Sequence, residues 1–118
     1  MVCLESHRVT LFLFRAKSAI HRGDVVIAAR KAKSDTLAQL GLLYRHQLEI
    51  LKGLTYHDYF NTLPPSGKDP EAWEFGVTEQ GRSIYIKLAL ITDRTENEYL
   101  TCISFHFATQ SITYPYKT

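Results

Sequence analysis

The strictest constraint in this sequence is an alternation of apolar and polar residues in three stretches between residues 73 and 107. Successive side chains of a β-strand point to opposite faces, so each stretch predicts a strand with one apolar side. If the apolar sides share one core, the stretches pair into an antiparallel sheet whose other face stays open. The apolar sides consist of Trp73, Phe75 and Val77, of Ile84, Ile86, Leu88 and Leu90, and of Ile103, Phe105 and Phe107.

The polar sides of the same stretches carry groups that exchange protons. A carboxylate, a phenol, an ammonium and an imidazole are expected together on the open face, from Glu74, Tyr85, Lys87 and His106, with Ser104 beside them. These are the side chains that general acid–base catalysis uses. The alternation therefore predicts a candidate site on the open face of the sheet.

Apolar residues recur at helical spacing upstream of the sheet. Residues 4–20 predict an amphipathic helix, and residues 48–53 predict another. Between them a helix is expected that begins at Ser34 or Asp35 and ends at Gly41. Helices followed by strands indicate an α+β fold, with N-terminal helices packed on one face of a small antiparallel sheet.

The remaining segments predict connections. Residues 25–29 are rich in β-branched side chains and predict a short strand at the sheet edge. The breaker at residues 64–67 predicts an exposed loop that leads into the first long strand. The tail of residues 114–118 is expected to lie over the sheet edge. No linker divides the chain, so residues 1–118 are expected to form one domain.

Charge and cysteine content limit the class of protein. A net charge of +2 neither requires nor excludes a nucleic-acid partner. Cys3 and Cys102 have neither a CxxC partner nor metal-ligand spacing, which predicts a reducing compartment without a disulfide framework. The histidines show no zinc spacing, and the sequence has no glycine-rich phosphate loop or dinucleotide fingerprint, so we expect no metal and no cofactor. No apolar run is long enough to span a membrane, so we expect a cytoplasmic protein without membrane contact.

Several short motifs, taken in order, resemble a known family. They are Leu40-Gly41-Leu42, Gly53-Leu54, Asp58-Tyr59-Phe60, Trp73, Ile84-Tyr85-Ile86-Lys87-Leu88 and Ile103-Ser104-Phe105. Their order and spacing, over roughly residues 29–106, resemble the MqsR-type toxins of bacterial toxin–antitoxin systems. The resemblance implies a RelE-like fold and an mRNA interferase, an endoribonuclease that cleaves mRNA at specific sequences without metal. It also implies a cognate antitoxin, and it leaves ribosome association open.

The resemblance extends unevenly to the catalytic positions. Tyr85 and Lys87 match the Tyr-x-Lys strand that holds the family's catalytic tyrosine. Asn61 and His106 stand where the family has lysines, and Glu74 stands where it has a glutamine. Glutamate and histidine are better general bases than the residues they replace, so the substitutions are compatible with an altered acid–base set.

RNA cleavage without metal needs a base for the ribose 2′-hydroxyl, an acid for the departing 5′-oxygen, and cations for the phosphate. We expect Glu74 to be the base and His106 the acid, because an imidazole can carry a proton near neutrality. Lys87 and Arg82 are expected to hold phosphate oxygens. Tyr85 is expected to donate to the phosphate or to stack on a base.

A basic group provides further candidate substrate contacts. Arg30, Lys31 and Lys33 predict a patch that follows the RNA phosphates, with a solvated helix flank as the alternative. Asn61 is either a catalytic side chain or a cap of the proline loop. Cys102 is either a nucleophile on the face of His106 or, as is commoner in mid-strand, a small core residue.

Two other readings of the open face remain at this stage. Glu74 and Lys87 are also compatible with a plain cross-strand ion pair. A non-catalytic RNA- or protein-binding module of the same fold is then the alternative function. A small-molecule enzyme that uses Glu74 and His106 would require a closed pocket.

Overall fold

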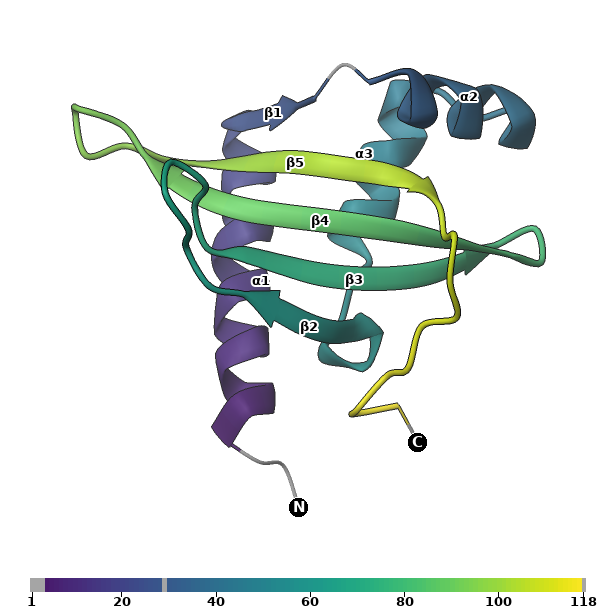
Figure 1. Cartoon of the computed structure of the whole chain (residues 1–118). Helices are drawn as coiled ribbons and strands as arrows, with labels where there is room; N and C mark the ends of the chain where they lie inside the picture. The colour runs from purple at the N-terminus through teal and green to yellow at the C-terminus, as the bar shows by residue number, and fades with distance from the viewer. Residues whose placement is uncertain (1–3, 29, 118) are drawn as a thin grey trace.

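The computed structural model describes residues 4–28 and 30–117 and places three α-helices against a five-stranded sheet (Figure 1). The helices are α1 (Leu4–Arg22), α2 (Lys31–Leu40) and α3 (Tyr44–Lys52), followed by the 3₁₀ turn η1 (Tyr56–Asp58). The strands are β1 (Val25–Ile27), β2 (Tyr59–Leu63), β3 (Ala72–Glu79), β4 (Arg82–Thr92) and β5 (Glu98–Phe107). The expected α+β class, with N-terminal helices against the sheet, is confirmed.

The sheet is mixed, with the strand order β1-β5-β4-β3-β2. Strands β2 to β5 are antiparallel neighbours, but β1 lies parallel to β5, with Val25 opposite Leu100. The expectation of a wholly antiparallel sheet is therefore wrong. No hairpin joins β1 to β5, so nothing local dictates its direction. The expected edge strand is confirmed up to Ile27, and Ala29 lies outside the described residues.

Strand β2 lies in a passage for which the alternation predicted no strand. It pairs with β3, with Asn61 opposite Glu74 and Leu63 opposite Ala72. A register shift between Tyr59 and Asn61 interrupts the period of two. Because that period is the sequence signal for a strand, the irregular β2 gives none.

Helix α2 begins at Lys31, one turn before the predicted caps Ser34 and Asp35. Its position is set by contact with the sheet, because the Thr36 hydroxyl accepts the Phe107 N–H at 3.1 Å. Thr36 is buried and covers the edge of β5 beyond the end of β1. The end of the helix agrees with the prediction, since the next residue adopts the left-handed conformation that favours glycine.

The core lies between the sheet and the helices α1 and α3 (Figure 1). The Phe12 ring of α1 stacks on Trp73, with ring centroids 4.7 Å apart, and lies 6.1 Å from Phe75. The predicted apolar side of the central strands is buried there, including Ile84, Ile86, Leu88 and Phe105. This packing leaves the opposite face of the sheet uncovered by α1 and α3.

A β-bulge in β5 changes which residues face the core. Lys87 pairs with Ser104 whereas Leu88 pairs with Cys102, so Ile103 is an extra residue. Cys102 therefore lies in the core, 1% exposed, and its expected place on the face of His106 is wrong. Burial raises the pKa of the Cys102 thiol to about 12, which leaves it unsuited as a nucleophile. Ile103, expected in the core, lines a hollow of the open face with Lys87.

Candidate active site

Strand register brings the predicted acid–base residues together on the open face. Glu74 of β3 lies opposite Lys87 of β4, and Tyr85 lies opposite His106 of β5. Asn61 joins them from β2, directly opposite Glu74. Four strands thus contribute one side chain or more to a single cluster.

Glu74 is the centre of this cluster because both of its carboxylate oxygens accept hydrogen bonds. The Asn61 side-chain N–H donates to Oε1 at 2.8 Å, and the Tyr85 hydroxyl donates to Oε2. The oxygens are thus held by neutral donors, although Lys87 is the cross-strand neighbour. Asn61 orients the carboxylate instead of capping the proline loop.

Tyr85 is held in its protonated form. Burial, the hydrogen bond to Glu74 and the negative charge of that carboxylate all raise the pKa of Tyr85 above its ordinary value. A phenol in this setting is a hydrogen-bond donor and not a base at neutral pH. Its single hydroxyl proton is given to Glu74, so its role in the cluster is to fix that carboxylate.

The state of Tyr85 can be tested by alkaline titration. Because its pKa is higher in the folded than in the unfolded protein, its contribution to stability is complete below the ordinary value of 10.0 and is lost as pH rises through the folded value. We expect Tyr85→Phe to lose one late-ionising phenol in the ultraviolet titration and to show a smaller alkaline fall in the free energy of unfolding. Equal titration curves for the two proteins would contradict the assignment.

His106 is oriented by the backbone. Its Nδ1 lies 2.9 Å from the main-chain carbonyl of Phe107, and since a carbonyl only accepts, Nδ1 carries the proton. The neutral ring therefore has its lone pair on Nε2, the atom left to exchange a proton. The ring centroid lies 5.2 Å from that of Tyr85. This geometry is suited to a group that alternates between acid and base.

A hollow of about 320 Å³ lies over the cluster. Its floor is formed by Glu74, Tyr85 and His106, and Phe60 stands beside Tyr85, with ring centroids 6.0 Å apart. Residues 108–112, just after β5, form the remaining wall. Sequence reasoning missed Phe60 and this wall. The available signal was Gly76 inside β3, because glycine within a strand often marks the close approach of another segment.

A second hollow, of about 560 Å³, is lined by two positively charged side chains. Lys87 and Arg30 line it together with Asp69 and the proline loop. Lys87 borders both this hollow and the acid–base cluster, through its position opposite Glu74. The open face therefore combines proton-exchanging groups with adjacent positive charge.

Lys31 and Lys33, the other members of the predicted basic group, do not line this hollow. Lys31 is exposed and paired with Asp35 across one turn of α2, at 2.7 Å. Lys33 is half-buried on α2, where its charge acts on the Cys102 thiol. Of the three basic residues, Arg30 is the one that the structure brings beside Lys87.

Arg82 is not part of the cluster. Its guanidinium lies 3.4 Å from the centroid of the Phe107 ring and donates to the Gln39 side chain at 3.0 Å. Phe107 packs against the core, so Arg82 lies on the helix side of the sheet. The expected contact of Arg82 with substrate phosphate is not supported by this position.

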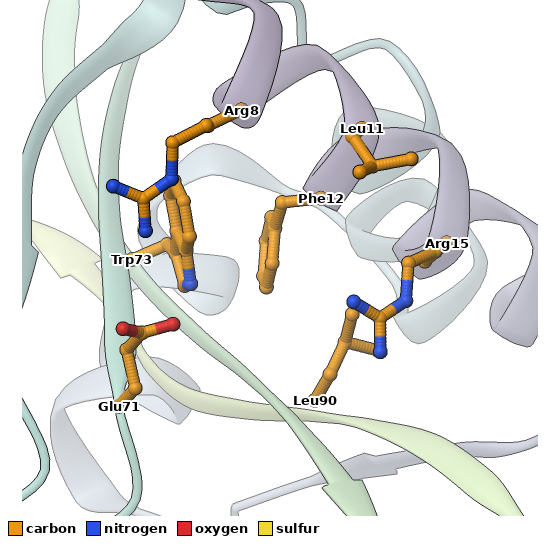
Figure 2. Close-up of a pocket in the computed structure, with 7 residues that line it drawn as sticks. All are labelled: Arg8, Leu11, Phe12, Arg15, Glu71, Trp73 and Leu90. Atoms are coloured by element: carbon orange, nitrogen blue, oxygen red, sulfur yellow. The ribbon is translucent and has the colours of Figure 1, made fainter. Parts of the chain in front are cut away.

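A separate hollow of about 270 Å³ lies between α1 and the sheet. Figure 2 shows the Arg8 guanidinium beside the Trp73 indole, and Glu71 lines the same hollow. The second cation there, Arg15, is paired with Glu98. Because none of the predicted acid–base residues reaches this hollow, we assign the candidate site to the open face.

No protein-family model, no curated protein and no solved structure matches this chain. Within residues 4–28 and 30–117, no three His, Cys, Asp or Glu side chains are grouped so that they could hold a metal ion. In that same part of the chain no helix has the length and apolar character needed to cross a membrane.

Proposed function

We propose that this protein is a metal-independent endoribonuclease whose active site is the open face of the sheet. The observation that carries the proposal is the cluster of Glu74, Tyr85 and His106, which shares its face with Lys87 and Arg30. RNA contains its own nucleophile, the ribose 2′-hydroxyl, so its cleavage needs only a base, an acid and positive charge. This face has all three.

In the proposed reaction Glu74 takes the proton of the 2′-hydroxyl, and the 2′-oxygen forms a bond to phosphorus. The bond from phosphorus to the 5′-oxygen breaks, and Nε2 of protonated His106 supplies the proton that the 5′-oxygen requires. Lys87 stabilises charge on the phosphate oxygens, and Asn61 keeps Glu74 oriented. The Tyr85 hydroxyl donates to Oε2 of Glu74 before the reaction and turns to the phosphate once that oxygen has taken the proton. The products are a 2′,3′-cyclic phosphate and a 5′-hydroxyl.

The biological setting that fits this reaction is that of an mRNA interferase toxin. The proposal includes a cognate antitoxin, as the motif resemblance to MqsR-type toxins implies, and action on mRNA in the cytoplasm. Expression in a bacterial host is expected to arrest growth, and an antitoxin encoded beside the gene is expected to relieve the arrest.

Incubation of the purified protein with ribosome-free RNA in EDTA tests the proposed reaction. We expect cleavage to persist in the chelator and the product ends to be a cyclic phosphate and a 5′-hydroxyl. Ends with a 3′-hydroxyl and a 5′-phosphate would contradict the mechanism. If folded protein leaves free RNA intact, a repeat with translating ribosomes shows whether cleavage requires them, and intact mRNA there would reject the nuclease.

A non-catalytic binding module is the second candidate function. It is favoured by the two hydrogen bonds to Glu74, which occupy both carboxylate oxygens and are also compatible with a purely structural role. The two functions differ in what Glu74→Gln does. A binding module is expected to keep its RNA affinity without ever cutting, whereas the nuclease loses cleavage on the order of 100-fold or more.

A further inference from the structure

The chain crosses the open face after β5, and we call residues 108–117 the C-terminal strap. The Ala108 N–H donates to the Ser83 carbonyl at 2.9 Å, at the point where the strap leaves β5. The strap then runs past the ends of β4 and β3 on its way to the C-terminus (Figure 1). Residues 108–112 of the strap form one wall of the hollow over the acid–base cluster.

Gly76 of β3 provides the place where the strap rests on the sheet. A Cβ atom at Gly76 would lie 2.7 Å from Cδ1 of Ile112 and closer still to the Tyr114 hydroxyl. A residue with a side chain fits there only if the Ile112 and Tyr114 side chains of the strap shift. Burial of the phenol at this contact raises the pKa of Tyr114. The backbone of Gly76 is not left-handed, so the closeness of these two strap side chains is the reason that glycine suits this position.

The end of the strap is anchored on the helix side of the sheet. The Tyr116 ring stacks on the buried Tyr59, with centroids 5.8 Å apart and an interplanar angle of 15°. The Tyr116 carbonyl lies 2.8 Å from Nδ1 of His57. Because the strap is attached at Ser83, at Gly76 and at Tyr59, its middle is held at a fixed distance from the cluster.

The two walls of the hollow differ in chemistry. The floor and the side at Phe60 carry a row of rings, in which Tyr85 neighbours both Phe60 and His106. The other wall is the strap, where Thr109, Gln110 and Ser111 are exposed and line the opening. Aromatic side chains stack on unpaired bases, and hydroxyl and amide groups pair with base edges. Rings on one side and polar groups on the other match a nucleobase.

We propose that the C-terminal strap and the Phe60–Tyr85 rings form a subsite for one unstacked RNA base, and that the strap determines which base is accepted. This inference rests on the proposed function, since the base belongs to a nucleotide flanking the cleaved phosphate. The rings supply affinity that is similar for all four bases. Gln110 supplies discrimination, because its amide both donates and accepts a hydrogen bond.

The test is binding of four 2′-fluoro RNA homo-octamers, which lack the attacking hydroxyl, measured by fluorescence anisotropy. Phe60→Ala is expected to weaken binding of all four by about 5- to 140-fold. Gln110→Ala is expected to reduce the ratio of the best to the worst affinity by about 2- to 10-fold. Gly76→Ala, which forces the Ile112 and Tyr114 side chains of the strap to shift, is expected to reduce that ratio as well. Thr113→Ala is the matched control, because Thr113 is an exposed strap residue outside the hollow's lining.

The outcomes separate this inference from the proposed function. An affinity ratio that is unchanged in Gln110→Ala and Gly76→Ala, in a protein that still cleaves RNA, overturns the subsite and leaves the nuclease standing. A strap-dependent ratio in a protein that cuts no RNA supports the subsite and contradicts the nuclease. Failure of the folded wild-type protein to bind any of the octamers overturns the subsite.

Discussion

Replacement of His106 by alanine is expected to slow RNA cleavage by on the order of 100- to 10,000-fold, the usual contribution of one acid–base group. The side chain is half-buried in the hollow, and its Nδ1 is committed to the Phe107 carbonyl. Nε2 is then the atom that protonates the leaving oxygen. The measurement is the single-turnover rate with excess protein, which removes any effect on product release.

Two further variants make this expectation specific. His106→Gln retains a polar side chain of similar length but cannot transfer a proton, so its rate is expected to fall as far as that of His106→Ala. His21→Ala removes an exposed histidine in the last turn of α1, which does not line the hollow. This variant is expected to leave the rate unchanged. A rate in His106→Gln close to that of the wild type would remove His106 from the mechanism.

Replacement of Phe75 by alanine is expected to lower the free energy of unfolding by about 3–5 kcal/mol. Phe75 is fully buried, with its ring centroid 6.1 Å from Phe12 and 6.0 Å from Tyr59. The expected loss has two parts: the hydrophobic transfer free energy of the removed ring, and the cost of the cavity that it leaves between α1 and the sheet. Urea denaturation followed by circular dichroism measures it.

Phe14→Ala is the matched control for this change. Phe14 lies on α1 and its side chain is 69% exposed, so loss of its phenyl ring is expected to change the free energy of unfolding by no more than about 0.5 kcal/mol. A loss in Phe14→Ala as large as that in Phe75→Ala would show that the covered face of the sheet is not where the core lies.

Much of the fold was predictable because β3, β4 and the part of β5 after its bulge keep a period of two on one buried face. The same alternation also places Arg82, which has the parity of Ile84 and so belongs to the helix side. The position of Cys102 was not predictable, since a bulge at Ile103 shifts the period without any local signal such as glycine. The parallel pairing of β1 depends on contacts remote in sequence, which periodicity does not report.

The candidate site was predictable to the extent that it lies on regular strands. Glu74, Tyr85 and His106 follow directly from the alternation once the strands are paired in register. Periodicity did not predict Phe60 or the path of residues 108–113, because β2 is irregular and the strap has no periodic structure. Their positions follow from tertiary contacts at Gly76 and Tyr59. Gly76 within β3 was the available signal that another segment lies close to the sheet there.

The most direct test of the central claim, that the open face cleaves RNA through the 2′-hydroxyl, compares two oligonucleotides. The first is an RNA containing a mapped cleavage site, and the second is identical except for a 2′-deoxy sugar on the 5′ side of the cleaved bond. We expect the protein to cut the first in EDTA and to leave that bond of the second intact, while binding both. Equal cleavage of the two oligonucleotides would contradict the claim.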